Sequence, residues 1–288
     1  MSITNPELLQ DLLCCPTCHA RLQQNAAYLH CAGCQARYPV VDGVPQFVES
    51  SIPPRIVSTE RWLVQLKNQL KAFPKLYEFL TDICSPVLMA GKSRAILLNR
   101  LPPTAVILNL GSGTRRISSS VIQVDYLPLA GVDVVADVAH LPFPDCSVDG
   151  VISEATLEHV RDRQCAIDEM RRVLKPGGYL YIIVPFLVGY HASPDDYYRW
   201  TRQGLLADLH GIDPIEIGVR SGPTSALLWV LQEWFAMSLS FNITFLYQVL
   251  LLLFMLMTFP LKVLDIILNH YGMAWKIAAT YYYLGRKT

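Results

Sequence analysis

Four cysteines near the start of the chain have the spacing of metal ligands. Cys15 and Cys18 form one C-x2-C pair, Cys31 and Cys34 form a second, and twelve residues separate the pairs. Each pair places two thiolates on one side of a tight turn, so two pairs can supply the closed tetrahedral set that Zn²⁺ favours. Such a site leaves no position open for a substrate, and we therefore predict a structural zinc ion. The alternative is four unliganded structural cysteines. Cys14 does not fit the spacing and is expected to face a small core.

A pair of glycines follows an apolar, β-branched run at Ala105–Leu110. Gly111 and Gly113 would end a strand in a turn, and a helix after such a turn would let backbone amides approach a bound ligand. Asp125 ends the next β-type run, about a dozen residues further on. A carboxylate at this point can accept hydrogen bonds from both hydroxyls of a ribose. The glycine pair alone is a weak signal, so the elements downstream decide its meaning.

These elements alternate between short β-type runs and helical stretches from residue 105 to 219, a pattern typical of a parallel sheet with crossover helices. Upstream, residues 50–104 begin as a linker and continue with apolar residues at helical spacing. The predicted units are a zinc ribbon at 7–49, a linker and helical extension at 50–104, the main domain at 105–222 plus 278–288, and an apolar helical insertion at 223–277. The expected strands are 105–110, 121–125, 132–136, 149–154, 179–185, 212–219 and 281–287.

The strings LNLGSGT, LPFPD, LEHV and RRVLKPGG occur in this order between Leu108 and Gly178. With them, the block from Val106 to Pro185 resembles the class I, Rossmann-like S-adenosylmethionine-dependent methyltransferases of the type 11 group. The resemblance implies an α/β fold with a seven-stranded Rossmann-like sheet. It also implies S-adenosylmethionine as the cofactor and methyl transfer as the reaction.

The resemblance also implies roles for residues around the glycine turn. Gly111 and Gly113 match the loop under the methionine part of the cofactor. Asp125 matches the acid that binds the ribose, and Tyr126 matches the neighbour that flanks the adenine.

Further along, Asp137 and the backbone of Val138 match the position that contacts adenine, and Glu154 lies where the fourth strand opens beside the methyl sulfonium. The chain departs from the family at two positions. Asn109 stands where the family usually has an acid facing the cofactor's amino group, and Arg115 replaces the third glycine of the loop and is followed by a second arginine. These changes would weaken cofactor binding. A catalytically weak or inactive scaffold of a membrane-associated complex is therefore the alternative to an active enzyme.

The N-terminal pattern from Leu13 to Pro45 resembles the small zinc-ribbon activator proteins of tRNA and protein methyltransferases, above all in its Tyr-Pro-x-x-Asp-Gly-x-Pro tail. The ribbon on its own would suggest a tRNA or translation-factor substrate. The charge of the chain is balanced, with 24 basic and 24 acidic residues, whereas a nucleic-acid footprint needs a basic excess. We therefore expect no nucleic-acid partner.

Beyond the fifth strand, the stretch from His191 to Thr201 resembles a pattern seen in ribbon-fused or glycan-cluster methyltransferases. In this class the segment lies over the methyl-transfer face. His191 could act as general base for a hydroxyl or amine acceptor, with Asp196 orienting it. Equally, Asp196 and Arg199 could form an ion pair that fixes the loop, because methyl transfer can proceed by alignment alone.

The apolar segment carries no charged residue between Trp234 and Leu261, and by length it is a candidate membrane span. If 281–286 completes the sheet, however, both ends of the segment lie on one side of any membrane. We therefore expect an interfacial or re-entrant helical unit. The alternatives are a segment that is buried in protein or forms a dimer, and a true span.

Together these features predict an enzyme that methylates an unidentified acceptor, which is a lipophilic small molecule or a lipid-linked molecule. The first thirteen residues lack a basic start followed by an apolar run, so we expect no secretory signal. Eight cysteines without a secretory route imply a reducing compartment. We therefore expect a cytoplasmic protein at the cytoplasmic face of a membrane, with a homodimer as a further option.

Overall fold

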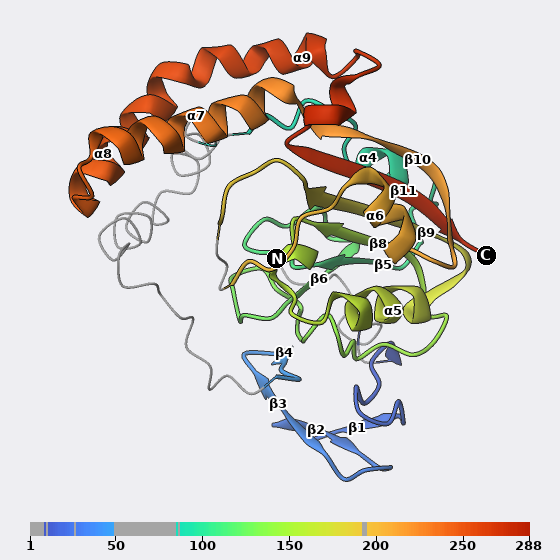
Figure 1. Cartoon of the computed structure of the whole chain (residues 1–288). Coiled ribbons are helices and arrows are strands. Elements are labelled where there is room, and N and C mark those ends of the chain that lie inside the picture. Colours follow the sequence, from blue (N-terminus) through green and yellow to red (C-terminus); the bar gives the residue numbers. More distant parts are fainter. Residues whose placement is uncertain (1–8, 10, 26, 49–84, 86, 192–194) are drawn as a thin grey trace.

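The computed structural model describes residues 9, 11–25, 27–48, 85, 87–191 and 195–288 (Figure 1). The helices expected from apolar spacing within 50–84 lie outside these described residues. The remaining chain forms a small N-terminal sheet, a large central sheet and a long helical insertion.

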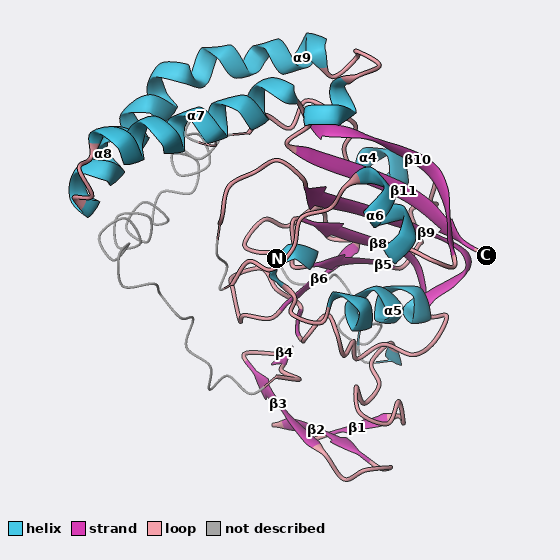
Figure 2. Ribbon diagram, viewed as in Figure 1, coloured by secondary structure: helices cyan, strands magenta, loops and turns pink. Residues whose placement is uncertain are grey.

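The N-terminal unit is a four-stranded antiparallel sheet in the order β1-β2-β3-β4 (Figure 2). Asp42 and Gly43 join the last two strands with φ values of 51° and 80°, as a tight two-residue hairpin requires. The strands are β1 Leu22–Gln24, β2 Tyr28–Cys31, β3 Arg37–Val41 and β4 Val44–Pro45.

The central sheet has seven strands in the order β10-β11-β9-β8-β5-β6-β7. Neighbouring strands from β9 to β7 are parallel, whereas β11 runs antiparallel to both β9 and β10. This is the Rossmann-like sheet that the sequence predicts, with all seven strands at or near their expected positions. The strands are β5 Ile107–Leu110, β6 Val121–Asp125, β7 Val134–Val135, β8 Val148–Glu154, β9 Leu174–Pro185, β10 Ile212–Ser221 and β11 Thr280–Lys287.

Two local expectations are wrong. The glycine turn after β5 does not open a helix, because residues 111–120 form only turns before β6 begins. Arg116 in this connection is held by Asp133, and three consecutive serines follow at 118–120, so no apolar helical face forms. The Pro-Gly-Gly turn lies inside β9 rather than before it, where the pairing with β8 shifts register and Gly177 has a φ of 79°.

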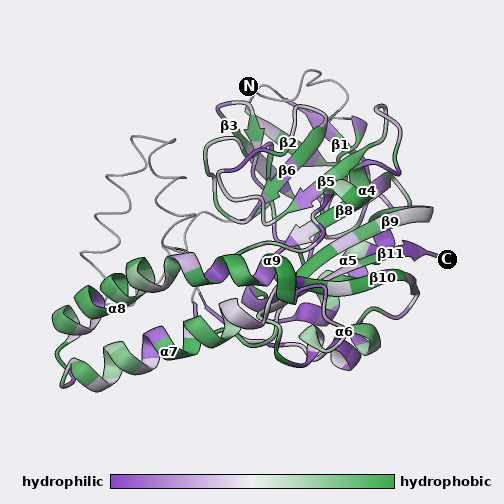
Figure 3. Cartoon of the chain, turned by 90° about the horizontal axis from the view of Figure 1, so that it is seen from above, coloured by the Kyte–Doolittle hydropathy of each residue, from purple (hydrophilic) through white to green (hydrophobic). Residues whose placement is uncertain are grey.

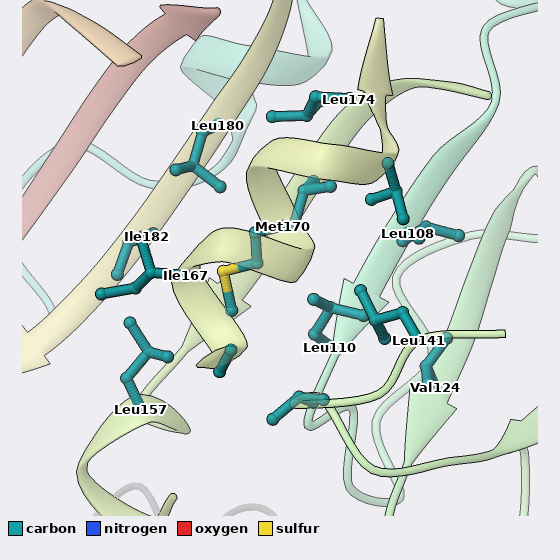
Figure 4. Close-up of a cluster of buried hydrophobic side chains, with 14 of the residues drawn as sticks. Leu108, Leu110, Val124, Leu141, Leu157, Ile167, Met170, Leu174, Leu180 and Ile182 are labelled. Atoms are coloured by element: carbon teal, nitrogen blue, oxygen red, sulfur yellow. The ribbon is translucent and has the colours of Figure 1, made fainter. Parts of the chain in front are cut away.

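Helices cover both faces of the sheet. On one face α5 Arg163–Val173 buries Ile167 and Met170 against strand residues such as Leu108 and Leu180 (Figure 4). On the other face α4 Ala95–Leu98 packs Leu97 against residues that include Tyr181. A strand buried on both faces needs apolar residues in succession, which explains the continuous β-branched runs in the sequence.

The segment after β10 is the predicted helical insertion. It consists of two long helices that form an antiparallel hairpin and three short helical turns that lead back to β11 (Figures 1 and 3). Phe241 and Asn242, with φ values of 51° and 63°, reverse the chain at the tip of the hairpin. The elements are α7 Pro223–Leu239, α8 Thr244–Thr258, η3 Phe259–Leu264, α9 Asp265–Leu268 and η4 Ala274–Ile277.

The N-terminal sheet is attached to the edge of the central sheet. The Phe47 N–H donates to the carbonyl of Val135 in β7 at 2.8 Å, and Gln46 forms a parallel bridge with the same residue. The Cys14 N–H donates to the carbonyl of Pro142 at 3.0 Å. The ribbon is therefore hydrogen-bonded to the edge strand next to the predicted adenine site.

Candidate functional site

Four parallel strands end at one edge of the central sheet. Leu110 pairs with Val124 on one side and Ser153 on the other, so the ends of β5, β6 and β8 are level, and β9 ends beside them. In sheets of this kind ligands bind outside the carboxyl ends of the strands. The predicted cofactor residues follow these ends.

The glycine turn has the backbone that the prediction requires. Gly111 and Gly113 have φ values of 67° and 59°, which favour glycine over other residues. A Cβ on Gly111 would overlap the side chain of Thr156, whereas a Cβ on Gly113 would meet nothing within 4 Å. Gly111 is thus fixed by packing inside the protein, and Gly113 borders open space where a ligand can approach the backbone.

Asp125 lies across from this turn at the end of β6. Its carboxylate accepts the N–H of Gly113 at 2.8 Å and that of Leu127 at 3.0 Å. A carboxylate can accept about four hydrogen bonds, so two acceptor positions are left for ribose hydroxyls. The residues present at this edge fit the cofactor that the sequence implies.

The predicted adenine residues lie further along the same edge. Tyr126 is 40% exposed and Val138 is 6% exposed. Asp137 accepts the N–H of Ala139 at 2.9 Å, which holds its carboxylate in a short turn after β7. Their contacts with a cofactor stay predictions.

Asn109 and the arginine that follows Arg115 are engaged within the protein. The Asn109 amide is buried and donates to the side-chain oxygen of Gln123 at 2.8 Å. Arg116 forms a bidentate ion pair with Asp133, with N–O distances of 2.9 and 3.0 Å. Arg116 is therefore bound to the sheet edge and does not enter the glycine turn.

Glu154, at the end of β8, forms an ion pair with Arg94. Arg94 immediately precedes α4 and lies sixty residues earlier in the chain. The sequence analysis missed this arginine, and no local pattern could have revealed it, because the two residues meet only through the fold.

The loop after β9 carries His191 and Asp196. The guanidinium of Arg199 binds both carboxylate oxygens of Asp196 at 2.5 and 2.6 Å, and the backbone N–H of His191 donates to the same carboxylate at 2.9 Å. Burial raises the pKa of Asp196, but the bonds from Arg199 and His191 outweigh burial and lower it. This geometry matches the loop-fixing ion pair. The catalytic role of His191 and Asp196 stays a prediction.

His191 itself lies between two carboxylates. Its Nε2 is 3.6 Å from Glu158 and its Nδ1 is 3.5 Å from Asp196. Burial lowers the pKa of His191, but the carboxylate of Glu158 and the carbonyl of Gly189 outweigh burial and raise it.

The insertion reaches this loop through Trp229 of α7, which the sequence analysis did not single out. The indole ring lies 5.7 Å from the imidazole of His191, measured between ring centres. A Cβ on Gly189 would overlap the same indole.

A separate cavity of about 290 Å³, lined by residues that include Arg202, Tyr271 and Trp275, contains none of the predicted site residues.

The four predicted zinc ligands converge. Their sulfur atoms all lie within 4.8 Å of one another, with 3.5 Å between Cys15 and Cys34 and 3.3 Å between Cys18 and Cys31. Four sulfurs about 2.3 Å from a central zinc would be about 3.8 Å apart, so the donor set fits this ion. Burial raises the pKa of Cys15, but hydrogen bonds from Tyr38 and from backbone amides lower it to about 6.

Cys14 lies outside this set, as expected. It is 2% exposed, and burial raises its pKa to about 12. A thiol that stays protonated is a poor metal ligand.

Two segments of the chain match known families. Residues 108–182 match the family described as methyltransferase domain, and residues 7–43 match the family described as Trm112p-like protein. Both segments coincide with regions that the sequence analysis singled out.

Similar curated proteins include an O-methyltransferase of Pyrenophora dematioidea, 27% identical over 130 residues, which covers 36% of this chain and 49% of the relative. A ubiquinone/menaquinone biosynthesis C-methyltransferase of Haemophilus ducreyi is 38% identical over 74 residues, or 23% of this chain and 29% of the relative. The chain spans about half the length or less of the curated relatives it matches. Among solved structures, a 1,6-didemethyltoxoflavin-N1-methyltransferase of Burkholderia thailandensis is 16% identical, with a TM-score of 0.43 over 91% of this chain and 100% of that chain.

Proposed function

We propose that this chain, which carries a methyltransferase domain behind a Trm112p-like ribbon, transfers a methyl group from S-adenosylmethionine to a lipophilic or lipid-linked acceptor at a membrane surface. The observation that carries the proposal is an apolar helical hairpin that leaves the sheet at the edge of the cofactor site. The names of similar proteins include O-, C- and N-methyltransferases, so they do not select an acceptor atom.

The cofactor site supports the methyl-transfer part of the proposal. S-adenosylmethionine supplies a methyl group on a sulfonium, which a nucleophile can displace. In this chain the turn at Gly111 and Gly113 would hold the methionine part, and Asp125 would bind the ribose. Glu154, oriented by Arg94, would border the sulfonium. Arg116, the second of the two arginines in this loop, is bound to Asp133 and does not project into the turn.

The hairpin supports the proposal of an apolar acceptor at a membrane, because its apolar side chains are exposed and its buried side chains are mostly small or polar. Of the 33 exposed large hydrophobic residues described, 25 lie between Leu227 and Ile277. The buried positions of α7 are mostly small or polar, and Gln248 is the buried residue of α8. Between the helices, Gln232 donates to Thr258 at 2.6 Å. In Figure 3, most of α7 and α8 is coloured as hydrophobic. A helix pair with polar contacts inside and apolar side chains outside is typical of a lipid environment.

The continuous helical stretch Thr244–Leu268 is long and apolar enough to cross a membrane, and only 11% of its most apolar window is buried in the protein. Exposed apolar surface costs roughly 25 cal/mol per Å² in water. We therefore expect lipid or protein to cover the apolar surface of the hairpin. Among the residues that the structure describes, the core of the chain does not cover it. A lipid surface or a second copy of the chain would cover it, and we propose the lipid surface.

The position of the hairpin connects this surface to the reaction site. Ser221 and Thr280 pair at the same edge as Pro185, so the hairpin starts and ends where β9 ends. Trp229 then packs on the loop of His191. An acceptor held by the exposed hairpin would reach the cofactor edge along α7. Since both ends lie on one side, the hairpin would enter the membrane without crossing it, and we propose the cytoplasmic face.

Vesicle co-sedimentation tests the membrane part. The full chain should bind phospholipid vesicles. Replacing Phe245, Leu253 and Leu256 on α8 by Glu should weaken binding at least about tenfold, since each buried apolar side chain contributes roughly 1.5–3 kcal/mol and 1.4 kcal/mol is a factor of ten.

The matched control replaces Val41, Leu206 and Ile215, which are also exposed but lie outside the hairpin, by Glu. It should bind as the natural chain does. Recovery of a soluble, monodisperse monomer without detergent would contradict the membrane proposal, and a discrete soluble dimer would point to a second copy as the cover. An untargeted search for metabolites that lose or gain a methyl group on deletion would then identify the acceptor.

A further inference from the structure

The segment after β8 contains a buried carboxylate without a hydrogen-bond partner. Glu158, in the short helical turn η2 Leu157–His159, is 0% exposed. Neither of its carboxylate oxygens has a hydrogen bond to any part of the chain that the structure describes. A buried charge without compensation is unfavourable by several kcal/mol, so a positive group is expected beside it.

Two histidines lie at this carboxylate. His159 is its neighbour in sequence, and His191 comes from the loop after β9. One ligand atom from each of the three residues lies within 4.8 Å of the others. The imidazole rings are nearly perpendicular, with 5.3 Å between their centres. Two imidazoles and one carboxylate are a donor set that suits Zn²⁺, Fe²⁺ and Mn²⁺.

The second nitrogen of each ring is fixed in the way that metal-binding histidines require. His159 Nδ1 lies 2.7 Å from the carbonyl of Asp195, and His191 Nδ1 lies 3.1 Å from the carbonyl of Gly189. A carbonyl oxygen only accepts hydrogen bonds, so in the neutral form of each ring the proton is assigned to Nδ1 and the lone pair to Nε2. The guanidinium of Arg199 also lies 3.4 Å from His191 Nδ1. For His191 this Nε2 is the atom that faces Glu158, at 3.6 Å. Metal-ligating histidines are oriented in this manner by backbone carbonyls.

We propose that Glu158, His159 and His191 form a binding site for a divalent transition-metal cation. The site is separate from the cysteine ribbon and lies at the carboxyl edge of the sheet. The side chain of His191 is 32% exposed, so further coordination positions would open toward solvent. A His191 that binds a cation has no lone pair left to act as general base, so the two roles exclude each other.

Mn²⁺ is the probe for this site, because thiolates favour zinc whereas carboxylate and water ligands suit manganese. The full chain, with its ribbon loaded with zinc, is titrated with Mn²⁺, and free Mn²⁺ is measured by electron paramagnetic resonance. The natural chain should bind about one Mn²⁺, one for each such site. Glu158→Gln and His159→Ala should each weaken binding at least about tenfold, since even changes around metal ligands cost that much.

His210→Ala is the matched control, because His210 is exposed and lies outside the cluster. It should bind Mn²⁺ as the natural chain does, and thermal unfolding of all variants checks that they fold. If the natural chain binds no Mn²⁺ and no zinc beyond that of the ribbon, a protonated His191 paired with Glu158 replaces the metal, and the proposal is wrong. Binding that survives both substitutions in folded variants would equally overturn it. Neither outcome depends on methyl transfer.

Discussion

The carboxylate of Asp125 holds the glycine turn and is also the predicted ligand of the ribose. It already accepts two backbone N–H groups, one of them from the glycine turn, and it is the predicted ribose ligand. The turn and the ribose acid are therefore coupled before any cofactor binds. Loss of this carboxylate should affect both.

We predict that Asp125→Ala lowers the affinity for S-adenosylmethionine at least about tenfold. Two charge-assisted hydrogen bonds to the ribose would be lost, each contributing about 1.5–3 kcal/mol, and 1.4 kcal/mol corresponds to a factor of ten. Isothermal titration calorimetry measures the change. Asp213→Ala, at an exposed position near the opposite end of β10, is the control and should bind normally. Unchanged affinity in folded Asp125→Ala would refute the site.

At the cysteines, we predict about one zinc per chain in the Glu158→Gln variant, in which the second proposed cation site is removed, as one closed four-thiolate site requires. The cysteine substitutions are compared in this background. Cys15→Ser combined with Cys18→Ser should abolish it, whereas Cys14→Ser and Cys165→Ser should retain it, because neither thiol belongs to the set of four. Metal analysis of the purified protein measures this. Zinc that persists in the double variant would contradict the assignment of Cys15 and Cys18 as zinc ligands.

At the scale of elements, the strands were predictable and their connections were not. Runs such as Ile107–Leu110 and Val121–Asp125 are buried on both faces, so each residue had to be apolar or paired, and the pattern is visible in the sequence. The connection between them is ten residues long, and its form depends on the pairing of Arg116 with Asp133, which only the fold creates.

The residues of the candidate site that lie at strand ends could be predicted from the sequence, whereas those that come from other elements could not. Gly111, Gly113 and Asp125 lie at or just after the ends of β5 and β6, so strand positions alone bring them together. Arg94 and Trp229 reach the site from other elements, and no spacing in the sequence marks them. The cluster of Glu158 with His191 joins two loops in the same way.

Asp265 shows how the two ends of the insertion are held together. This fully buried carboxylate of α9 accepts the N–H groups of Thr224 and Ser225 at 2.8 and 2.9 Å and the Ser225 hydroxyl at 2.6 Å. It thus caps the first turn of α7 from a distant part of the chain, where a carboxylate also favours the helix dipole.

We predict that Asp265→Ala destabilises the protein by at least about 2 kcal/mol, because the buried donors left without an acceptor cost about 1–3 kcal/mol each. For a chain of this size the unfolding temperature should fall by at least roughly 4 °C. Circular dichroism in detergent follows the unfolding. Asp213→Ala serves again as the exposed control, and an equal loss in both variants would contradict the capping role.

At the scale of the whole molecule, the insertion is separable from the sheet. The Ala279 N–H donates to the carbonyl of Ser221 at 2.9 Å, so the two ends of the insertion are neighbours. A short turn can therefore replace residues 223–277 without separating β10 from β11, and loop-closure entropy changes only slowly with loop length.

We predict that this deletion variant folds and no longer binds vesicles. Its affinity for S-adenosylmethionine should stay within about threefold of the natural value, a difference of only about 0.65 kcal/mol. The reason is that the residues proposed to bind the cofactor lie outside the insertion, whereas those proposed to bind lipid lie within it. Calorimetry and co-sedimentation measure the two properties. Vesicle binding that survives the deletion would place the membrane surface elsewhere in the chain.

The position of β11 has a consequence for how the protein is made. β11 follows the insertion in sequence but lies between β9 and β10 in the sheet. During synthesis the chain emerges from its N-terminal end, so the apolar hairpin leaves the ribosome while a central strand is still missing. At that stage the facing edges of β9 and β10 are unpaired and open to pairing with other chains. A nascent chain that reaches a lipid surface at this point would shield its hairpin first and complete its sheet afterwards, so membrane contact and folding would be linked in time.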